Sequence, residues 1–149
     1  MRLTQHTDYS LRVLIHLALK KGELATIREI SEAYGVSKNH LTKVVQNLVR
    51  SGYVESVRGK RGGLRLNRPP EEVSLGEIAK KMEPDFSLVE CQRPENQCVI
   101  TPDCTLPRVL TGALHAFMDH LNQFTLQDLI PEESQTGLAE VLLIEPLTS

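Results

Sequence analysis

Residues 26–66 constrain the fold more than any other part of the chain, because two helix patterns and a hairpin pattern follow one another directly. Thr26 and Glu29 have the capping-box spacing that opens a helix, and Gly35 is suited to end it. Ser37 then precedes a segment whose apolar residues recur at the helical period, namely Leu41, Val44, Val45, Leu48 and Val49. Two helices joined by a short turn containing glycine predict a helix-turn-helix.

The next segment predicts a β-hairpin with a positively charged tip. Residues 53–57 and 64–66 have the composition of two short strands, and the glycines between them permit a tight turn. Arg58, Lys60 and Arg61 would repel one another on a turn that faces only water. We therefore interpret the hairpin as a wing that contacts the backbone or the minor groove of DNA. The predicted fold class is mainly α with a small β-wing, a winged helix-turn-helix.

The second helix of such a motif reaches base edges in the major groove with its first residues. Asparagine can pair with adenine, and lysine can reach guanine or phosphate. An ordinary pair of helices with a solvated polar face is the alternative, and the basic wing favours DNA. The candidate DNA-binding residues are Ser37, Lys38, Asn39, His40, Thr42 and Lys43 of the helix, with Arg58, Lys60 and Arg61 of the wing.

Charge divides the chain at the same place as the motifs. Residues 1–68 contain 13 Lys and Arg against 5 Asp and Glu, whereas residues 69–149 contain 4 against 14. A basic half that faces nucleic acid and an acidic half that avoids it would give this asymmetry. Pro69 and Pro70 separate the halves, so we expect a winged helix-turn-helix domain over residues 1–70. Residues 71–149 would hold a cysteine loop, a dimerisation helix and a C-terminal tail.

Two shorter helices are predicted from their caps. Thr7 or Asp8 is expected to cap a first helix over Tyr9–Leu19, which is dense in apolar residues. Ser74 opens a second short helix that ends near Met82.

A long helix is predicted over Leu106–Phe124, beyond the completed wing domain. Its apolar stripe suits core packing or a seam between two helices, and its position favours dimerisation. One further turn follows at Thr125, and the tail from Glu132 to Gly137 is polar. The apolar patch from residue 141 to 144 is available to pack on a partner. The stripe consists of Leu106, Leu110, Ala113, Leu114, Phe117, Leu121 and Phe124.

All three cysteines, Cys91, Cys98 and Cys104, fall within one polar loop. Clustered thiolates select zinc, copper(I) or iron-sulfur clusters. The spacing lacks the paired cysteines of structural zinc sites and also differs from ferredoxin spacings. Iron-sulfur is favoured at this point, while zinc and a metal-free thiol site stay open. The odd thiol count leaves one coordination position, for which His16 and His115 are weak candidates.

The remaining features exclude several classes of protein. No Ser/Cys–His–Asp constellation and no glycine-rich phosphate loop is present, so we do not expect an enzyme. No window reaches the roughly 18 apolar residues of a membrane span, and the start lacks a signal peptide. Three cysteines without a signal peptide do not indicate a disulfide framework. We expect a cytoplasmic protein with no membrane partner.

Four motifs and the three cysteines resemble the NsrR branch of the IscR/NsrR/RirA family of winged-helix regulators. The motifs are LTxxTDYSLR at 3–12, VSKNHLxKV at 36–44, GYV at 52–54 and RGKxGG at 58–63. The resemblance implies a homodimeric repressor that binds a double-stranded DNA operator and senses nitric oxide. It also implies an iron-sulfur cluster, 4Fe-4S rather than 2Fe-2S, held by Cys91, Cys98 and Cys104. Asp8 of the partner subunit would be the fourth ligand.

Two alternatives stay open beside this reading. One is an iron-availability or cluster-biogenesis regulator on the same scaffold. Its IscR branch has a histidine ligand three residues after the third cysteine, where this chain has Pro107, which argues against that ligand set. The other alternative is a zinc-stabilised interaction module whose basic face meets an acidic protein.

Overall fold

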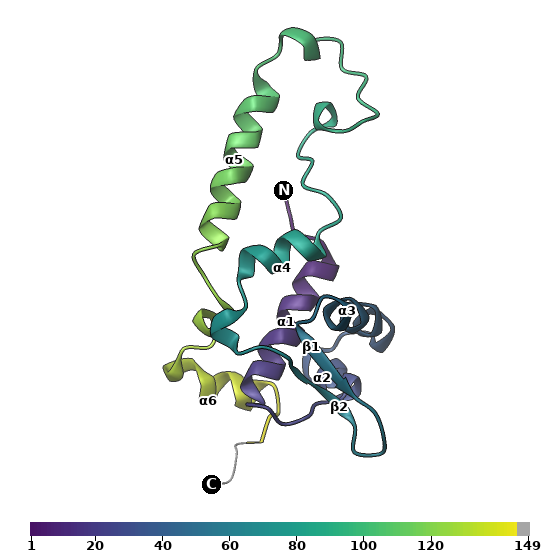
Figure 1. Cartoon of the computed structure of the whole chain (residues 1–149), viewed down its shortest axis with the longest axis vertical. Coiled ribbons are helices and arrows are strands. Elements are labelled where there is room, and N and C mark those ends of the chain that lie inside the picture. The colour runs from purple at the N-terminus through teal and green to yellow at the C-terminus, as the bar shows by residue number, and fades with distance from the viewer. Residues whose placement is uncertain (146–149) are drawn as a thin grey trace.

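Three helices and a hairpin form the first half of the computed structural model, which describes residues 1–145 (Figure 1). The helices are α1 (Gln5–Leu19), α2 (Ile27–Tyr34) and α3 (Lys38–Arg50), and the hairpin pairs β1 (Val54–Val57) with β2 (Gly63–Leu66) in antiparallel register. This arrangement confirms the predicted fold class, mainly α with a small β-wing.

Local sequence signals account for the helix-turn-helix. Both bonds of the predicted capping box are present, because Glu29 N donates to Thr26 Oγ1 (3.1 Å) and Thr26 N donates to Glu29 Oε2 (2.7 Å). Gly35 ends α2 in the left-handed conformation, with φ 63°. Four residues of the predicted apolar period of α3 are buried, namely Leu41, Val44, Val45 and Leu48, whereas the fifth, Val49, is exposed.

The N-cap of α1 differs from the prediction, and the N-cap of α3 lacks a side-chain bond. The N-cap of α1 is Thr4, whose hydroxyl accepts a hydrogen bond from Thr7 N (3.4 Å), so the prediction of Thr7 or Asp8 was wrong. A contact far along the chain favours Thr4, because its N and Oγ1 both donate to Glu83 Oε1 (2.7 and 3.1 Å). Ser37 occupies the N-cap of α3, but its side chain makes no capping bond.

Segments on both sides of residue 70 pack around α1 in one hydrophobic core. They include α4 (Leu75–Met82), the 3₁₀ helix Leu126–Leu129 and α6 (Glu132–Val141). The polar segment described above as a tail therefore forms most of α6. Leu142 and Ile144 are buried in the chain's own core, so the expectation that this patch packs on a partner was wrong for these two residues.

The remaining long helix, α5 (Leu106–Leu121), extends away from the core together with the cysteine loop (Figure 1). We call residues 84–121 the arm and the rest of residues 1–145 the body. Helix α5 ends before the predicted Phe124, because the chain turns there and Leu75 N donates to Phe124 O (3.0 Å). Within the described residues, every helix is too short or too polar to cross a membrane.

Candidate DNA-binding surface and cysteine loop

Helix α3 presents most of its predicted DNA-binding residues to solvent. Ser37, Lys38, Asn39, His40 and Lys43 are exposed, while the opposite face is anchored in the core. The sequence pattern therefore places these residues on one accessible surface. Their role in binding DNA stays a prediction.

Thr42 differs from the other candidates on this helix. It is half-buried, and its hydroxyl donates to Lys38 O (2.8 Å). The hydroxyl therefore already has a partner within the helix, and its methyl group is the part free to contact a base.

The wing tip carries charge without ion pairs. Arg58, Lys60 and Arg61 are exposed, and none belongs to the four ion pairs found among residues 1–145. On the stem, by contrast, Arg65 Nε lies 2.8 Å from Glu55 Oε2, and the two residues are cross-strand partners. The net positive charge of the wing is therefore concentrated at its tip.

Two glycines shape this tip. Gly59 has φ 113°, which disfavours any residue with a side chain. A Cβ at Gly62 would lie 2.2 Å from Val57 O, while Gly62 N donates to Gly59 O (3.0 Å). The turn thus needs glycine at both positions, as the sequence pattern indicated.

The three cysteines are free thiols distributed along the arm. Cys91 lies in the 3₁₀ helix Glu90–Gln92, Cys98 is exposed, and Cys104 follows the 3₁₀ helix Thr101–Asp103. Within residues 1–145, no group of three or more His, Cys, Asp or Glu side chains is arranged to hold a metal ion. The loop therefore brings the thiols onto one segment but does not gather them around one point.

The chemistry of this donor set fits an iron-sulfur cluster. Three unpaired thiols without a disulfide can all become thiolate ligands, the kind that holds such clusters. The backbone around Cys98 is ordered by short-range bonds, since Cys98 N donates to Asn96 Oδ1 (2.9 Å) and Thr101 Oγ1 donates to Cys98 O (2.8 Å). No packed core holds the loop in place, because no residue from 84 to 121 is buried.

Asp8 lies in the first turn of α1 and pairs with Arg12. Arg12 Nε donates to Oδ1 (3.0 Å) and Nη2 donates to Oδ2 (2.8 Å), which raises the pKa of the Arg12 guanidinium. Both side chains are almost half exposed. Because Thr4 is the cap, the Asp8 carboxylate is not needed for capping. The i,i+4 spacing made this pair visible in the sequence, but the prediction did not include Arg12.

The two histidines considered as further ligands lie in different surroundings. His16 is 2% exposed in the core, and burial lowers its pKa from 6.5 to about 4. Neither of its ring nitrogens has a hydrogen-bond partner among the described residues. His115 is exposed on α5. His16 therefore has the environment of a neutral core residue.

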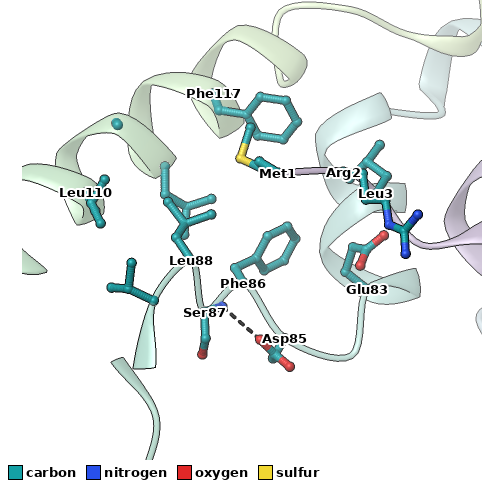
Figure 2. A pocket seen from close by; sticks show the side chains of 13 residues that line it. Met1, Arg2, Leu3, Glu83, Asp85, Phe86, Ser87, Leu88, Leu110 and Phe117 are labelled. Atoms are coloured by element: carbon teal, nitrogen blue, oxygen red, sulfur yellow. Dashed lines mark hydrogen bonds between the residues drawn. The ribbon is translucent and has the colours of Figure 1, made fainter. Parts of the chain in front are cut away.

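Helix α5 carries an apolar stripe that the rest of residues 1–145 does not fully bury. Beside it lies an apolar hollow of about 640 Å³, between α5, the first three residues and the segment 85–89. Figure 2 shows the side chains of Met1, Phe86, Leu88 and Phe117 gathered around this hollow. The sequence predicted the stripe, but not that the N-terminus would line the same hollow.

The sequence as a whole matches one family of regulators. The Rrf2 family, described as iron-dependent transcriptional regulators, matches residues 3–132. The chain belongs to the Rrf2 family. It is thus a transcriptional regulator rather than an enzyme, and the suggested resemblance is confirmed at this level.

Individual relatives of this Rrf2 protein agree with the family match. The HTH-type transcriptional regulator NsrR of Bacillus licheniformis is 52% identical over 132 residues, covering 87% of this chain and 92% of that protein. NsrR of Bacillus subtilis is 51% identical over 132 residues, covering 87% and 90%. A solved structure from Listeria innocua superposes with TM-score 0.71 at 30% identity, covering 87% of this chain and 86% of that one.

Proposed function

We propose that this Rrf2 protein is a dimeric repressor that carries an iron-sulfur cluster and leaves its operator when nitric oxide attacks the cluster. The proposal depends mainly on one observation. All three free thiols lie on the loop that joins the DNA-binding body to an exposed apolar helix. The similarity to proteins named NsrR supports the same assignment.

The apolar stripe of α5 supports the homodimer. Leu106 of the stripe is 48% exposed, and Val109, one turn before Ala113 on the same helix, is 59% exposed. An isolated chain gains nothing from such exposure, whereas a second copy could bury the same stripe against itself. A two-fold dimer would also set the spacing of two reading helices against two operator half-sites.

The DNA-binding surface of the proposal comprises α3 and the wing tip. Asn39 would read base edges, with Ser37, Lys38, His40, Thr42 and Lys43 beside it. Arg58, Lys60 and Arg61 would contact phosphates, since each is exposed and none forms an ion pair within residues 1–145.

The ligands of the cluster would be Cys91, Cys98 and Cys104, with Asp8 of the partner subunit completing the set. A bound 4Fe-4S cluster supplies iron centres that react with nitric oxide. The chain's part is to hold the three thiolates on a loop that is otherwise unpacked. A carboxylate binds such a centre more weakly than a thiolate does, so the Asp8 corner would be the exchangeable one.

A path for the signal leads from the loop to the reading helix. Glu83, immediately before the arm, accepts a hydrogen bond from Thr4 N at the N-cap of α1 (2.7 Å). Two residues after Thr4, His6 of α1 contacts α3, where its Nε2 accepts a hydrogen bond from Asn47 Nδ2 (3.0 Å). A change in the order of the loop would therefore reach α3 through α1.

The experiment that tests the function uses protein purified without oxygen. We expect a visible absorption spectrum typical of an iron-sulfur cluster, selective binding to a duplex selected from random DNA, and loss of that binding on titration with nitric oxide. If a dimer neutralises about 8 phosphates, the slope of log K against log salt is about −7. Colourless zinc protein, or equal binding to selected and random duplexes, would refute the proposal.

Substitutions separate base reading from phosphate contact. Lys60→Ala should weaken binding to selected and random duplexes alike and reduce the salt slope by about 1 per lost phosphate contact. Asn39→Ala should cost about 1–3 kcal/mol mainly at the selected sequence. Equal effects of Asn39→Ala on both duplexes would remove Asn39 from base reading.

The family description favours a second candidate, a regulator of the same scaffold that responds to iron supply. Iron limitation, imposed by a chelator without nitric oxide, would then release DNA at chelator concentrations that leave a nitric oxide sensor bound. The chelator titration is run on the same selected duplex, so the two signals are compared directly.

A further inference from the structure

A small hollow lies where α1 meets α3. Its volume is about 190 Å³, and no carboxylate is among the residues that line it. Val44 forms its buried floor, and the other side chains are polar. The lining residues are Gln5, His6, Tyr9, His40, Lys43 and Val44.

Contacts between the two helices fix the walls of this hollow. Asn47 Nδ2 donates to His6 Nε2 (3.0 Å), and the rings of Tyr9 and His40 lie 6.2 Å apart. The Arg12 guanidinium lies over the Tyr9 ring, 5.4 Å from its centroid. The Tyr9 ring is therefore held between a neighbour on its own helix and one on α3, which orders it before any ligand binds.

The charge of the hollow suits an anion. Lys43 is exposed and belongs to none of the ion pairs found among residues 1–145. Arg12, by contrast, is paired with Asp8, and it contributes to the hollow through its contact with the Tyr9 ring. Lysine, tyrosine and glutamine side chains are all common donors to phosphate oxygens.

The position of the hollow indicates that the phosphate would belong to the DNA backbone. A helix with its side chains is about 10–12 Å across and fills a major groove about 12 Å wide. The flanks of a reading helix therefore face the phosphates of the groove wall. Because His40 and Lys43 belong to α3, the hollow between α3 and α1 opens beside that wall.

We propose that this hollow holds one backbone phosphate of bound DNA, with Gln5 and Tyr9 of α1 acting beside His40 and Lys43 of α3. This assignment rests on the proposed mode of DNA binding and extends it to the first helix. Tyr9 is a phosphate-binding residue that also fixes the position of α1 against the DNA. Since Tyr9 follows Asp8 in the chain, a movement of α1 would change this contact directly.

The test combines a side-chain change with neutralisation of single phosphates. Tyr9→Phe removes only a hydroxyl and should weaken binding to selected and random duplexes by about tenfold for each half-site, the size of one hydrogen bond to a charged group. Lys43→Gln should reduce the salt slope by about 0.9 for each half-site, or about 1.8 for the dimer. The matched control is Tyr34→Phe, whose hydroxyl donates to Arg12 O (3.0 Å) and lies outside the hollow.

A scan of the selected duplex with uncharged methylphosphonates then locates the contact. We expect one phosphate in each half-site at which neutralisation cancels the effects of both Tyr9→Phe and Lys43→Gln. If no position cancels both, or if Tyr9→Phe binds like Tyr34→Phe, the assignment is overturned. Binding of inorganic phosphate by the DNA-free protein, without any position dependence in the scan, would indicate a free-anion site and would also overturn it.

These outcomes are separate from a failure of the proposed function. Equal binding of the wild type to selected and random duplexes refutes the repressor. Selective wild-type binding with an unaffected Tyr9→Phe variant refutes only the phosphate site.

Discussion

The body and the arm differ in how far their side chains are buried and paired. In the body, residues such as Leu14, Leu48, Ile78 and Leu126 are at most 1% exposed. All four ion pairs found among residues 1–145 also lie there. In the arm, no residue from 84 to 121 is buried. The sequence of the body therefore supplies its own packing partners, while the rest of residues 1–145 covers the apolar and thiol groups of the arm only in part.

This difference indicates how such a regulator can respond to a signal. A packed body keeps the spacing of α3 and the wing constant, because close-packed cores resist small displacements. An arm whose order depends on a bound group and a second subunit can change when either is lost. The body would then bind DNA, and the arm would set the distance between the two bodies of a dimer.

Substitution of the cysteines should have the largest effect on regulation, without unfolding the body. Ala at Cys91, Cys98 or Cys104 removes a thiolate, so each variant should lose the visible absorption and regulated DNA binding completely. Helical content, measured by far-ultraviolet circular dichroism, should stay close to wild type because the body does not use these residues. A variant that retains the full spectrum and its response would exclude that cysteine as a ligand.

A pair of truncations compares the two regions directly. Leu48→Ala empties a fully buried position and should reduce the free energy of unfolding by about 2–5 kcal/mol. Val109→Ala, at a side chain 59% exposed, should change it by less than about 0.5 kcal/mol in dilute monomer while raising the dimer dissociation constant. Denaturant unfolding and analytical ultracentrifugation measure the two quantities. Similar losses of monomer stability would contradict the contrast between body and arm.

His16 tests whether the body has a pH dependence of its own. Burial lowers its pKa from 6.5 to about 4, with Glu29 opposing the shift and Lys20 adding to it. The unfolded chain therefore binds a proton more readily than the folded one between these values. Stability should be complete above pH 6.5 and fall as the pH is lowered towards 4, by on the order of 1–3 kcal/mol.

The matched variant for this test is His16→Leu, which fills a similar volume without a titrating group. It should remove the fall in stability over that pH range, as measured by urea unfolding at several pH values. An unchanged pH profile in His16→Leu would assign the dependence to other groups.

The elements of the body were predicted well because the signals that determine them are local in the sequence. The Thr26–Glu29 capping box, the apolar period of α3 and the glycines of the wing act within a few residues, and each appears in the structure. The cap of α1 was missed because hydroxyl or carboxylate groups at positions 4, 7 and 8 could all serve. Glu83, 79 residues away, favours Thr4.

The same limit applies to α6 and to the candidate sites. The polar sequence of α6 does not indicate that the helix packs on the body. Its Leu138 and Ala139 contact a core that is assembled from distant segments. The hollow beside Tyr9 arises from contacts between α1 and α3 that no sequence period encodes. The cysteine ligands could be proposed from residue type and resemblance, but spacing alone does not determine how their thiols would group around the proposed cluster.

Asp8 should show the smallest effect on stability and the most informative effect on regulation, because it is a body residue that the partner's arm would use. Its pair with Arg12 is half exposed, so Asp8→Asn should change the free energy of unfolding by about 0.5 kcal/mol or less. Arg12→Gln breaks the same pair but leaves the carboxylate. Because it also loses the contacts of the guanidinium with the Tyr9 and Tyr34 rings, its effect on stability should be larger, about 1 kcal/mol.

The two variants should differ once the cluster is present. Asn retains an oxygen but loses the anionic ligand, so Asp8→Asn should alter the absorption spectrum, the rate of reaction with nitric oxide and the operator affinity. Arg12→Gln should leave the spectrum unchanged, because a carboxylate released from arginine is still able to ligate. Stopped-flow spectroscopy and DNA binding on both variants measure these properties. If Asp8→Asn matches wild type in all three properties, Asp8 only pairs with Arg12. The cluster in the arm of one subunit then has no ligand from the body of the other.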